Sequence, residues 1–246
     1  MDILEAIIEA IDDDAPVGTV MRGLFWTAVV SRRCGLASTM MRETCLDEQK
    51  DDETALAYME KTGLELAREA VSNDITKASV GLASINSLID IDPGRCVSAN
   101  AADLLAKLGK DRSVAVVGHF PFTDDLRKVT KNVWVIEKWQ RPGDYPEEDA
   151  KTYLPRADIV AISSTTLMNG TLSGLLSLCR KESVTMLLGP TTPMTPVLFD
   201  FGIDIISGSL VTDVPLALKS IGEGVNFRQL KRTGSVRLIT MTRGAL

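Results

Sequence analysis

A regular alternation in the second part of the chain constrains the fold most. Short runs rich in β-branched residues recur there, and segments with helix-start signals or helical spacing separate them. Strands of this length that alternate with helices are typical of a mainly parallel, doubly wound sheet with helices on both faces. The predicted strands cover residues 113–117, 133–138, 158–163, 184–189, 203–208 and, as an edge strand, 235–241.

The first part of the chain is organised differently. Three turn-punctuated runs between residues 17 and 41 predict a small antiparallel sheet, and a short helix is expected before it over residues 2–12. Helical spacing then predicts helices over residues 53–71 and from an Asp74 cap to Leu88. A small sheet followed by helices makes a compact α+β unit.

Pro93 and Gly94 form the strongest boundary signal in the middle of the chain. We therefore expect two domains, a small α+β domain over residues 1–94 and a Rossmann-like α/β domain over residues 95–246. Neither part contains an internal repeat or a low-complexity tract.

Charge and hydropathy limit the partners of the chain. A net charge of -6 argues against nucleic acid as a partner, because phosphate neutralisation needs clustered Lys and Arg. All apolar runs are shorter than the roughly 20 residues that span a bilayer, and the acidic amphipathic N-terminus does not resemble a signal peptide. These features predict a cytoplasmic protein with no membrane insertion.

The four cysteines, Cys34, Cys45, Cys96 and Cys179, lie far apart and form no C-x-x-C pair. Such spacing predicts reduced thiols that serve as packing residues, and no disulfide scaffold or zinc knuckle. With one histidine in the chain, no cage of soft metal ligands is visible, so the sequence predicts no metal-ligating residues and identifies no cofactor.

The first strand of the predicted sheet runs into Gly118, His119 and Phe120. Ligands of open α/β sheets bind beyond the carboxyl ends of the strands, which places this loop at the expected crevice. It has one glycine where a dinucleotide fingerprint has three, and its bulky turn argues against a pyrophosphate cradle. His119 is a candidate general acid or base, and the alternative is a hydrogen-bonded structural histidine.

Glu137 lies at the end of the second predicted strand, 19 positions after Gly118. Nucleotide-binding folds place an acidic residue at this distance to bind ribose hydroxyls. Glu137 is therefore a second candidate for proton transfer or ligand contact, and the alternative is a surface or ion-paired glutamate.

Two further loops at the same edge are rich in hydroxyl groups. In the loop over 163–171, Thr165, Thr166, Asn169 and Thr171 offer neutral hydrogen-bonding groups, and the alternative is that the loop only caps the next helix through Thr171. Gly189, Thr191 and Pro193 belong to a second loop, which is either a binding loop or a structural turn.

Several motifs resemble a known family. Residues 118–122 (GHFPF), 157–172 and 187–208 are similar to the family labelled putative heavy-metal chelation domain. Residues 23–30 (GLFWTAVV) and 78–89 (ASVGLASINSLI) resemble the small domain that usually precedes it, which has an enolase N-terminal-like fold. Together the two resemblances cover nearly the whole chain.

The resemblance implies a Rossmann-like domain joined to an enolase N-terminal-like domain, with both lining one cleft. It also implies a chelating small-molecule ligand, such as a pterin-like, flavin-like or siderophore-like compound, and a functional link to metal transport proteins. Carried over by motif, the cleft residues are Trp26, Thr27, Asn86, Gly118, His119, Phe120, Glu137, Thr165, Thr166, Asn169, Gly189, Thr191 and Pro193. For Asn86, the alternative to ligand contact is a hydrogen bond to the end of a strand.

The leading hypothesis is a protein that binds such a metabolite or metal chelate between its domains and processes it by condensation or hydrolysis. His119 and Glu137 would then transfer protons. The main alternative is a chelate carrier or metallochaperone without chemistry. A methyltransferase that uses S-adenosylmethionine is a weaker alternative, because the first loop is not glycine-rich. Whether the chain is an enzyme, and whether it forms a homo-oligomer, the sequence leaves open.

Overall fold

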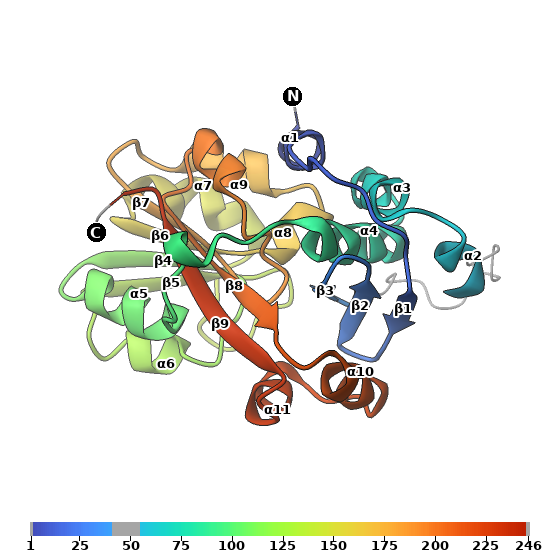
Figure 1. Cartoon of the computed structure of the whole chain (residues 1–246). Coiled ribbons are helices and arrows are strands. Elements are labelled where there is room, and N and C mark those ends of the chain that lie inside the picture. Colours follow the sequence, from blue (N-terminus) through green and yellow to red (C-terminus); the bar gives the residue numbers. More distant parts are fainter. Residues whose placement is uncertain (1, 41–54, 245–246) are drawn as a thin grey trace.

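The computed structural model describes residues 2–40 and 55–244, and it shows a mixed α/β fold with two sheets (Figure 1). One sheet has three antiparallel strands in the order β1-β2-β3, and the other has six strands in the order β5-β4-β6-β7-β8-β9. This architecture confirms the predicted fold class, a mainly parallel sheet combined with a smaller α+β unit.

The small sheet is covered by one long helix. Its strands are β1 (Thr19–Arg22), β2 (Trp26–Val30) and β3 (Cys34–Ser38), and α1 (Ile3–Glu9) precedes them. The long helix, α4 (Ile75–Leu88), begins at Asp74, which accepts a hydrogen bond from the backbone N–H of Thr76 as predicted. A Cβ on Gly35 of β3 would lie 2.1 Å from the carbonyl oxygen of Ala83, so helix and strand touch through their backbones.

The helix expected over residues 53–71 is divided. The structure has α2 (Ala55–Met59), α3 (Gly63–Ala67) and the 3-10 helix η1 (Arg68–Val71), while residues 53 and 54 lie outside the described residues. Thr62 starts α3 because its side chain accepts from Glu65 N while Glu65 bonds back to the Thr62 N–H, and this capping box ends the first helix. Met59, the last residue of α2, is 43% exposed.

The six-stranded sheet follows the predicted order along the chain. Its first five strands are parallel, and the last is an antiparallel edge strand. The strands are β4 (Ser113–Val117), β5 (Asn132–Ile136), β6 (Ile159–Ser163), β7 (Val184–Leu188), β8 (Ile205–Val211) and β9 (Val236–Thr242).

Helices cover both faces of this sheet, as a doubly wound fold requires. In β4, Val114 and Val116 pack against Leu105 and Leu126 of the helices on one face, whereas Ala115 belongs to the core on the other face. Burial on both sides explains why these strands are continuous apolar runs. The helices are α5 (Ala101–Gly109) and α6 (Thr123–Leu126) on the first face and α7 (Ala150–Tyr153), α8 (Thr165–Met168) and α9 (Leu172–Leu178) on the second.

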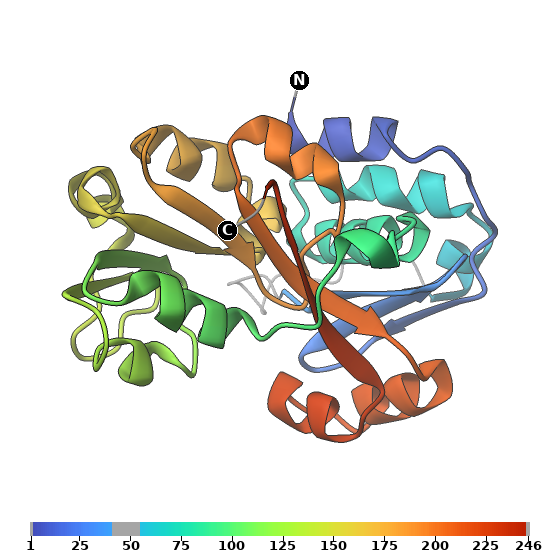
Figure 2. The ribbon, with the colours of Figure 1, turned by 60° about the vertical axis from the view of Figure 1, so that its left-hand side comes forward.

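The last two helices join the two sheets. α10 (Val214–Gly222) and α11 (Phe227–Arg232) follow β8 and lie together at one end of β9 (Figure 2). Their residues Ile221 and Leu230 share a core with Trp26 and Leu36 of the small sheet. The remaining 3-10 helices are η2 (Pro93–Arg95), η3 (Glu147–Asp149), η4 (Leu154–Arg156) and η5 (Pro196–Phe201).

Strand order reverses next to β4, because β5 pairs with one of its edges and β6 with the other. In doubly wound sheets this reversal opens a crevice at the carboxyl ends of the two diverging connections, where ligands bind. The fold therefore points to the loops that follow β4 and β6.

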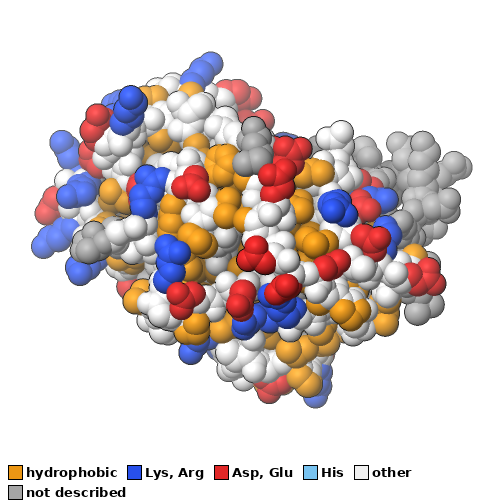
Figure 3. Space-filling model, turned by 45° about the horizontal axis from the view of Figure 1, so that its top comes forward, with side chains coloured by type: hydrophobic (Ala, Val, Ile, Leu, Met, Phe, Trp, Pro, Cys, Tyr) orange, Lys and Arg blue, Asp and Glu red, His pale blue; other side chains and the backbone are white. Residues whose placement is uncertain are grey.

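Acidic and basic side chains are both spread over the face that Figure 3 shows, with hydrophobic side chains between them. Among the described residues, no helix combines the length and the apolar character that crossing a membrane requires.

Candidate functional site

The loops after β4 and β6 lie against each other. Gly118 has a φ of 101°, a conformation that side chains other than glycine rarely adopt, and a Cβ placed there would lie 3.0 Å from Cβ of Ser163. The glycine therefore allows the end of β4 to turn directly beside the end of β6 and places His119 at the reversal of the sheet.

Two cavities open at this edge of the sheet. The first, of about 570 Å³, is named the aromatic cavity and is lined by residues that include Trp26, Phe120, Phe122, Gly189, Phe227 and Arg228. The second, of about 620 Å³, is named the hydroxyl cavity and is lined by residues that include Gly118, Glu137, Thr166, Asn169, Thr171 and Gly174. His119, Ser163 and Thr165 line both cavities and define the junction between them.

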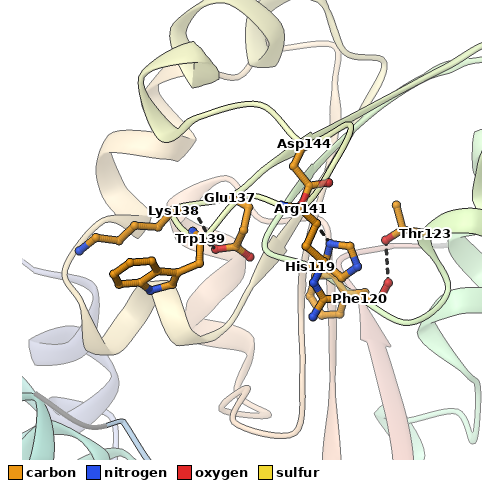
Figure 4. Close-up of polar contacts among 8 residues, drawn as sticks. All are labelled: His119, Phe120, Thr123, Glu137, Lys138, Trp139, Arg141 and Asp144. Atoms are coloured by element: carbon orange, nitrogen blue, oxygen red, sulfur yellow. Dashed lines mark hydrogen bonds and ion pairs between the residues drawn. The ribbon is translucent and has the colours of Figure 1, made fainter. Parts of the chain in front are cut away.

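His119 at the junction is held by a buried carboxylate (Figure 4). Its Nδ1 lies 3.2 Å from Oδ2 of Asp144, whose side chain is 3% exposed. The same oxygen accepts a hydrogen bond from the backbone N–H of Arg141. Since an ionised carboxylate only accepts hydrogen bonds, Nδ1 carries the proton, and Nε2 of the neutral ring is left as an acceptor.

Asp144 reaches His119 because its loop folds back along β5. The backbone N–H of Tyr145 donates to the carbonyl of Val135, and that of Glu137 donates to the carbonyl of Tyr145, at 2.7 and 2.9 Å. Asp144 is not among the residues predicted for the site. The pairing of Tyr145 with β5 brings it there, and local sequence patterns do not indicate this pairing. The turn signal of Pro142 and Gly143 before it is the one local indication.

Glu137 lies in the hydroxyl cavity but bonds within its own loop (Figure 4). Its Oε1 accepts hydrogen bonds from the backbone N–H groups of Lys138 and Trp139, at 2.8 and 3.4 Å. The carboxylate that bonds to His119 is thus Asp144.

The segment over residues 163–171, expected as a loop, contains the short helix α8. The Ser163 and Thr165 hydroxyl oxygens lie 2.9 Å apart at the junction. Thr166 also lines the hydroxyl cavity, but its hydroxyl donates to the carbonyl of Ser163 at 2.7 Å and the residue is buried. Within this segment, the residues that line both cavities are therefore Ser163 and Thr165, which meet His119 at the junction.

Asn169 and Thr171 pair with each other at the rim of the hydroxyl cavity. Oδ1 of Asn169 accepts from both the N–H and the hydroxyl of Thr171, at 3.2 and 2.7 Å. Thr171 forms no side-chain cap on α9, so the structure does not agree with the alternative in which the loop only caps this helix. Both residues are exposed and line the cavity.

Thr191 and Asn86 join the small sheet to the loop after β7. The Thr191 hydroxyl accepts from the backbone N–H of Ser38 at 2.9 Å, and Nδ2 of Asn86 donates to the carbonyls of Leu36 and Thr191 at 2.8 and 2.9 Å. Thr191 lines the aromatic cavity, whereas Asn86 lines neither of the two cavities. The structure thus agrees with the alternative in which Asn86 bonds to backbone.

Thr27 and Pro193 also lie outside the lining of both cavities. Thr27 is fully buried and its hydroxyl oxygen lies 3.0 Å from that of Thr39. Pro193 is a buried residue of the loop that follows β7.

Two pairs of aromatic side chains line the aromatic cavity. The rings of Phe120 and Phe122 stack with centroids 5.1 Å apart, and those of Trp26 and Phe227 pack at 5.5 Å with a tilt of 58°. Gly189, with a φ of 132°, lines the same cavity. Paired rings around a cavity of this size suit a planar, apolar group.

A family model described as "Putative heavy-metal chelation", DUF364, matches residues 100–240. The chain belongs to this family. A second model with the same description, DUF4213, matches residues 4–89. The first match spans nearly all of the six-stranded sheet with its junction, and the second spans the unit that contributes Trp26.

Three proteins that resemble the chain are themselves described as uncharacterised or of unknown function. A protein of Methanocaldococcus jannaschii described as uncharacterised is 33% identical over 163 residues, and the match covers 63% of this chain and 62% of that relative. A crystal structure of a DUF364 family protein of unknown function from Desulfitobacterium hafniense has a TM-score of 0.85 and 25% identity, with 98% of each chain covered. A family protein of unknown function from Pyrococcus horikoshii, at 21% identity over 98% of each chain, has the same fold with a TM-score of 0.80.

The side chains that the structure describes do not fit a resident metal centre. Within them, no three His, Cys, Asp or Glu side chains lie together in a way that could hold a metal ion. Cys34, Cys96 and Cys179 are free thiols, and Cys45 lies outside the described residues. Burial raises the pKa of Cys179 to about 11, so this thiol stays protonated at neutral pH.

Proposed function

We propose that this chain binds a small, ring-containing metabolite that chelates metal, at the junction of the aromatic and hydroxyl cavities. The observation that carries the proposal is that His119, Ser163 and Thr165 line both cavities at the reversal of the sheet. A ligand that spans the junction would place its ring between the aromatic side chains of the first cavity. Its polar, metal-chelating atoms would then lie near the hydroxyl groups of Ser163 and Thr165. The family description supports the choice of a chelating ligand.

We further propose that His119 accepts a proton from this ligand. Chelating hydroxyl and ring N–H groups lose protons when they bind a metal. Nε2 of His119 is suited to accept one, because Asp144 binds the opposite ring nitrogen and stabilises the charged ring. The metal in this proposal is cargo that arrives with the ligand.

Binding and processing would use the same residues. Condensation or hydrolysis of the ligand would need His119 to return its proton, whereas a carrier would release the chelate unchanged. The wall that includes Trp26 belongs to the first predicted domain, so we also propose that the site lies between the two domains. Location in the cytoplasm and a link with metal transport proteins are expectations of this proposal.

Native mass spectrometry of the purified protein tests binding directly. We expect a mass excess that is lost on denaturation and that belongs to an organic molecule, alone or with a metal. Incubation and reanalysis of the released molecule distinguish an enzyme, which changes it, from a carrier, which does not.

Thermal unfolding with added chelators tests the site. We expect at least one of dipicolinate, 2,3-dihydroxybenzoate and pterin-6-carboxylate, alone or with Zn²⁺ or Ni²⁺, to raise the Tm of the wild type and not that of His119→Ala. Lys181→Ala is the control, because Lys181 is exposed and lies before the amino end of β7. Equal stabilisation of wild type and His119→Ala would place the ligand elsewhere.

A further inference from the structure

We propose that the aromatic cavity recognises an oxyanion, a carboxylate or phosphate group, on its ligand, and that Arg228 and Lys231 bind this group. The inference rests on the proposed ligand site and narrows the ligand class. The ligand would be a planar chelator that carries an anionic group besides its chelating atoms.

The charges that line the aromatic cavity are unbalanced. Arg228 and Lys231 both line it, and within the described part of the chain neither side chain forms an ion pair or a hydrogen bond. Asp125 lines it too, but its carboxylate pairs with Lys128 at 2.6 Å. The cavity therefore presents a surplus of positive charge in a chain whose net charge is -6.

α11 holds the two cations beside an aromatic wall. Leu230 is fully buried in the core shared with β9 and the small sheet, which anchors the helix. Phe227 packs against Trp26 at 5.5 Å, next to Arg228 in the chain. Arg228 and Lys231 are three residues apart and so lie on neighbouring positions of one helix face. A ring against Phe227 thus has both cations near its edge.

The same wall contains an unsatisfied hydrogen-bond donor. Nε1 of Trp26 is buried and has no hydrogen-bond partner, and the residue is 7% exposed. A buried donor without an acceptor is destabilising, so such a group in a native protein calls for a bound water, ion or ligand as its acceptor. An oxyanion is rich in acceptors and would supply one to Nε1, provided that the Trp26 ring turns to expose this buried atom to the cavity.

Matched pairs of probes test the inference. 2,3-dihydroxybenzoate and 2,3-dihydroxybenzamide share a ring and a chelating pair, but only the first carries a carboxylate. Pyridoxine 5′-phosphate and pyridoxine test a phosphate in the same way. At low salt we expect the wild type to bind the anionic member of at least one pair about tenfold more tightly or better, measured by calorimetry and by tryptophan fluorescence. The pair that shows this preference identifies the oxyanion.

The double variant Arg228→Gln/Lys231→Gln should lose this preference, and its affinity ratio should fall to near 1. Arg232→Gln/Arg237→Gln is the matched control, because it removes the same charge from exposed side chains that do not line the cavity. Trp26→Phe should abolish the change in tryptophan fluorescence that occurs when the protein binds a probe.

Three results would overturn the inference: a wild type that binds both members of each pair equally, a wild type that binds none of the four probes, or a double variant that keeps the wild-type ratio. The variant His119→Ala distinguishes a failure of the anion site from a failure of the proposed ligand site at the junction. If His119→Ala abolishes binding of the probes and the double variant does not, the result supports the ligand site at the junction and contradicts the anion site. If the double variant no longer binds the anionic probe and His119→Ala still does, the result supports the anion site and contradicts the ligand site at the junction.

Discussion

Nδ1 of His119 lies 3.2 Å from Oδ2 of Asp144, 25 residues later in the chain. The two side chains are 23% and 3% exposed, so the contact is shielded from bulk water. A shielded carboxylate selects one tautomer of the imidazole, and here it leaves Nε2 as the proton acceptor at the junction.

Asp144→Ala should therefore change the tautomer of His119. The variant removes the acceptor of the Nδ1 proton, so the ring proton is free to move to Nε2. Because the chain has a single histidine, ¹⁵N NMR of the imidazole reports this directly. Asp125→Ala, at an exposed carboxylate paired with Lys128, should leave the signals unchanged. If both variants keep the wild-type tautomer, the carboxylate does not orient the ring.

Asn86→Ala should weaken the connection between the small sheet and the loop after β7. The change removes two hydrogen bonds, of 2.8 and 2.9 Å, and leaves the carbonyls of Leu36 and Thr191 without that donor. We expect a loss of about 2 kcal/mol in the free energy of unfolding, measured with urea. Asn73→Ala at an exposed position should change it by less than about 0.5 kcal/mol. Equal values for both variants would show that the Asn86 bonds contribute little.

The sheet could be predicted from the sequence because its strands are buried on both faces. Residues 114–116, for example, contact helices above and below, and such burial leaves a continuous apolar run in the sequence. The parallel order then locates the crevice, since ligand loops follow the carboxyl ends of strands. This rule leads to His119, Phe120, Thr165 and Gly189.

Other features depend on contacts that local sequence does not encode. Asp144 reaches His119 only because Tyr145 pairs with β5, and Asn86 is satisfied only by the loop that carries Thr191. α11 has a local signal, the capping box of Asn226 and Gln229, but the basic residues around it are also typical of a solvated face. The helix expected over residues 53–71 is interrupted at Thr62, where a capping box with Glu65 starts α3. The helical spacing continues across this position, so it hides the capping signal.

Gly189→Ala should destabilise the loop after β7. Gly189 has a φ of 132°, and an added Cβ would lie 2.7 Å from Oγ of Ser164 at the end of β6. Backbone strain and this contact together should cost about 2 kcal/mol or more in the free energy of unfolding. Gly174→Ala is the control, since Gly174 lies in α9 and an added Cβ there would meet no neighbouring side chain within 4 Å. Alanine at this helical position should be neutral or stabilising by up to about 1 kcal/mol. Similar unfolding midpoints for the two variants would contradict the prediction.

The thiol of Cys34 should make stability depend on alkaline pH. Burial raises the pKa of Cys34 from 9.0 to about 12, because the folded chain accommodates the thiol and disfavours the thiolate. The unfolded chain ionises first, so the contribution of this group to stability is complete below a pH of about 9 and is lost as the pH rises toward 12. Between pH 8 and pH 10 the loss from this group should be about 1 kcal/mol.

Urea unfolding of the wild type and of Cys34→Ala at these two pH values isolates the effect. Tyrosine and lysine titrate in both proteins, so the difference between their pH dependences belongs to Cys34. We expect the wild type to lose about 1 kcal/mol more than Cys34→Ala between pH 8 and pH 10. Cys96→Ala is the control, because Cys96 is only partly buried and its removal should change the pH dependence less. If the wild type and Cys34→Ala lose the same stability, the thiolate of Cys34 is tolerated in the folded chain.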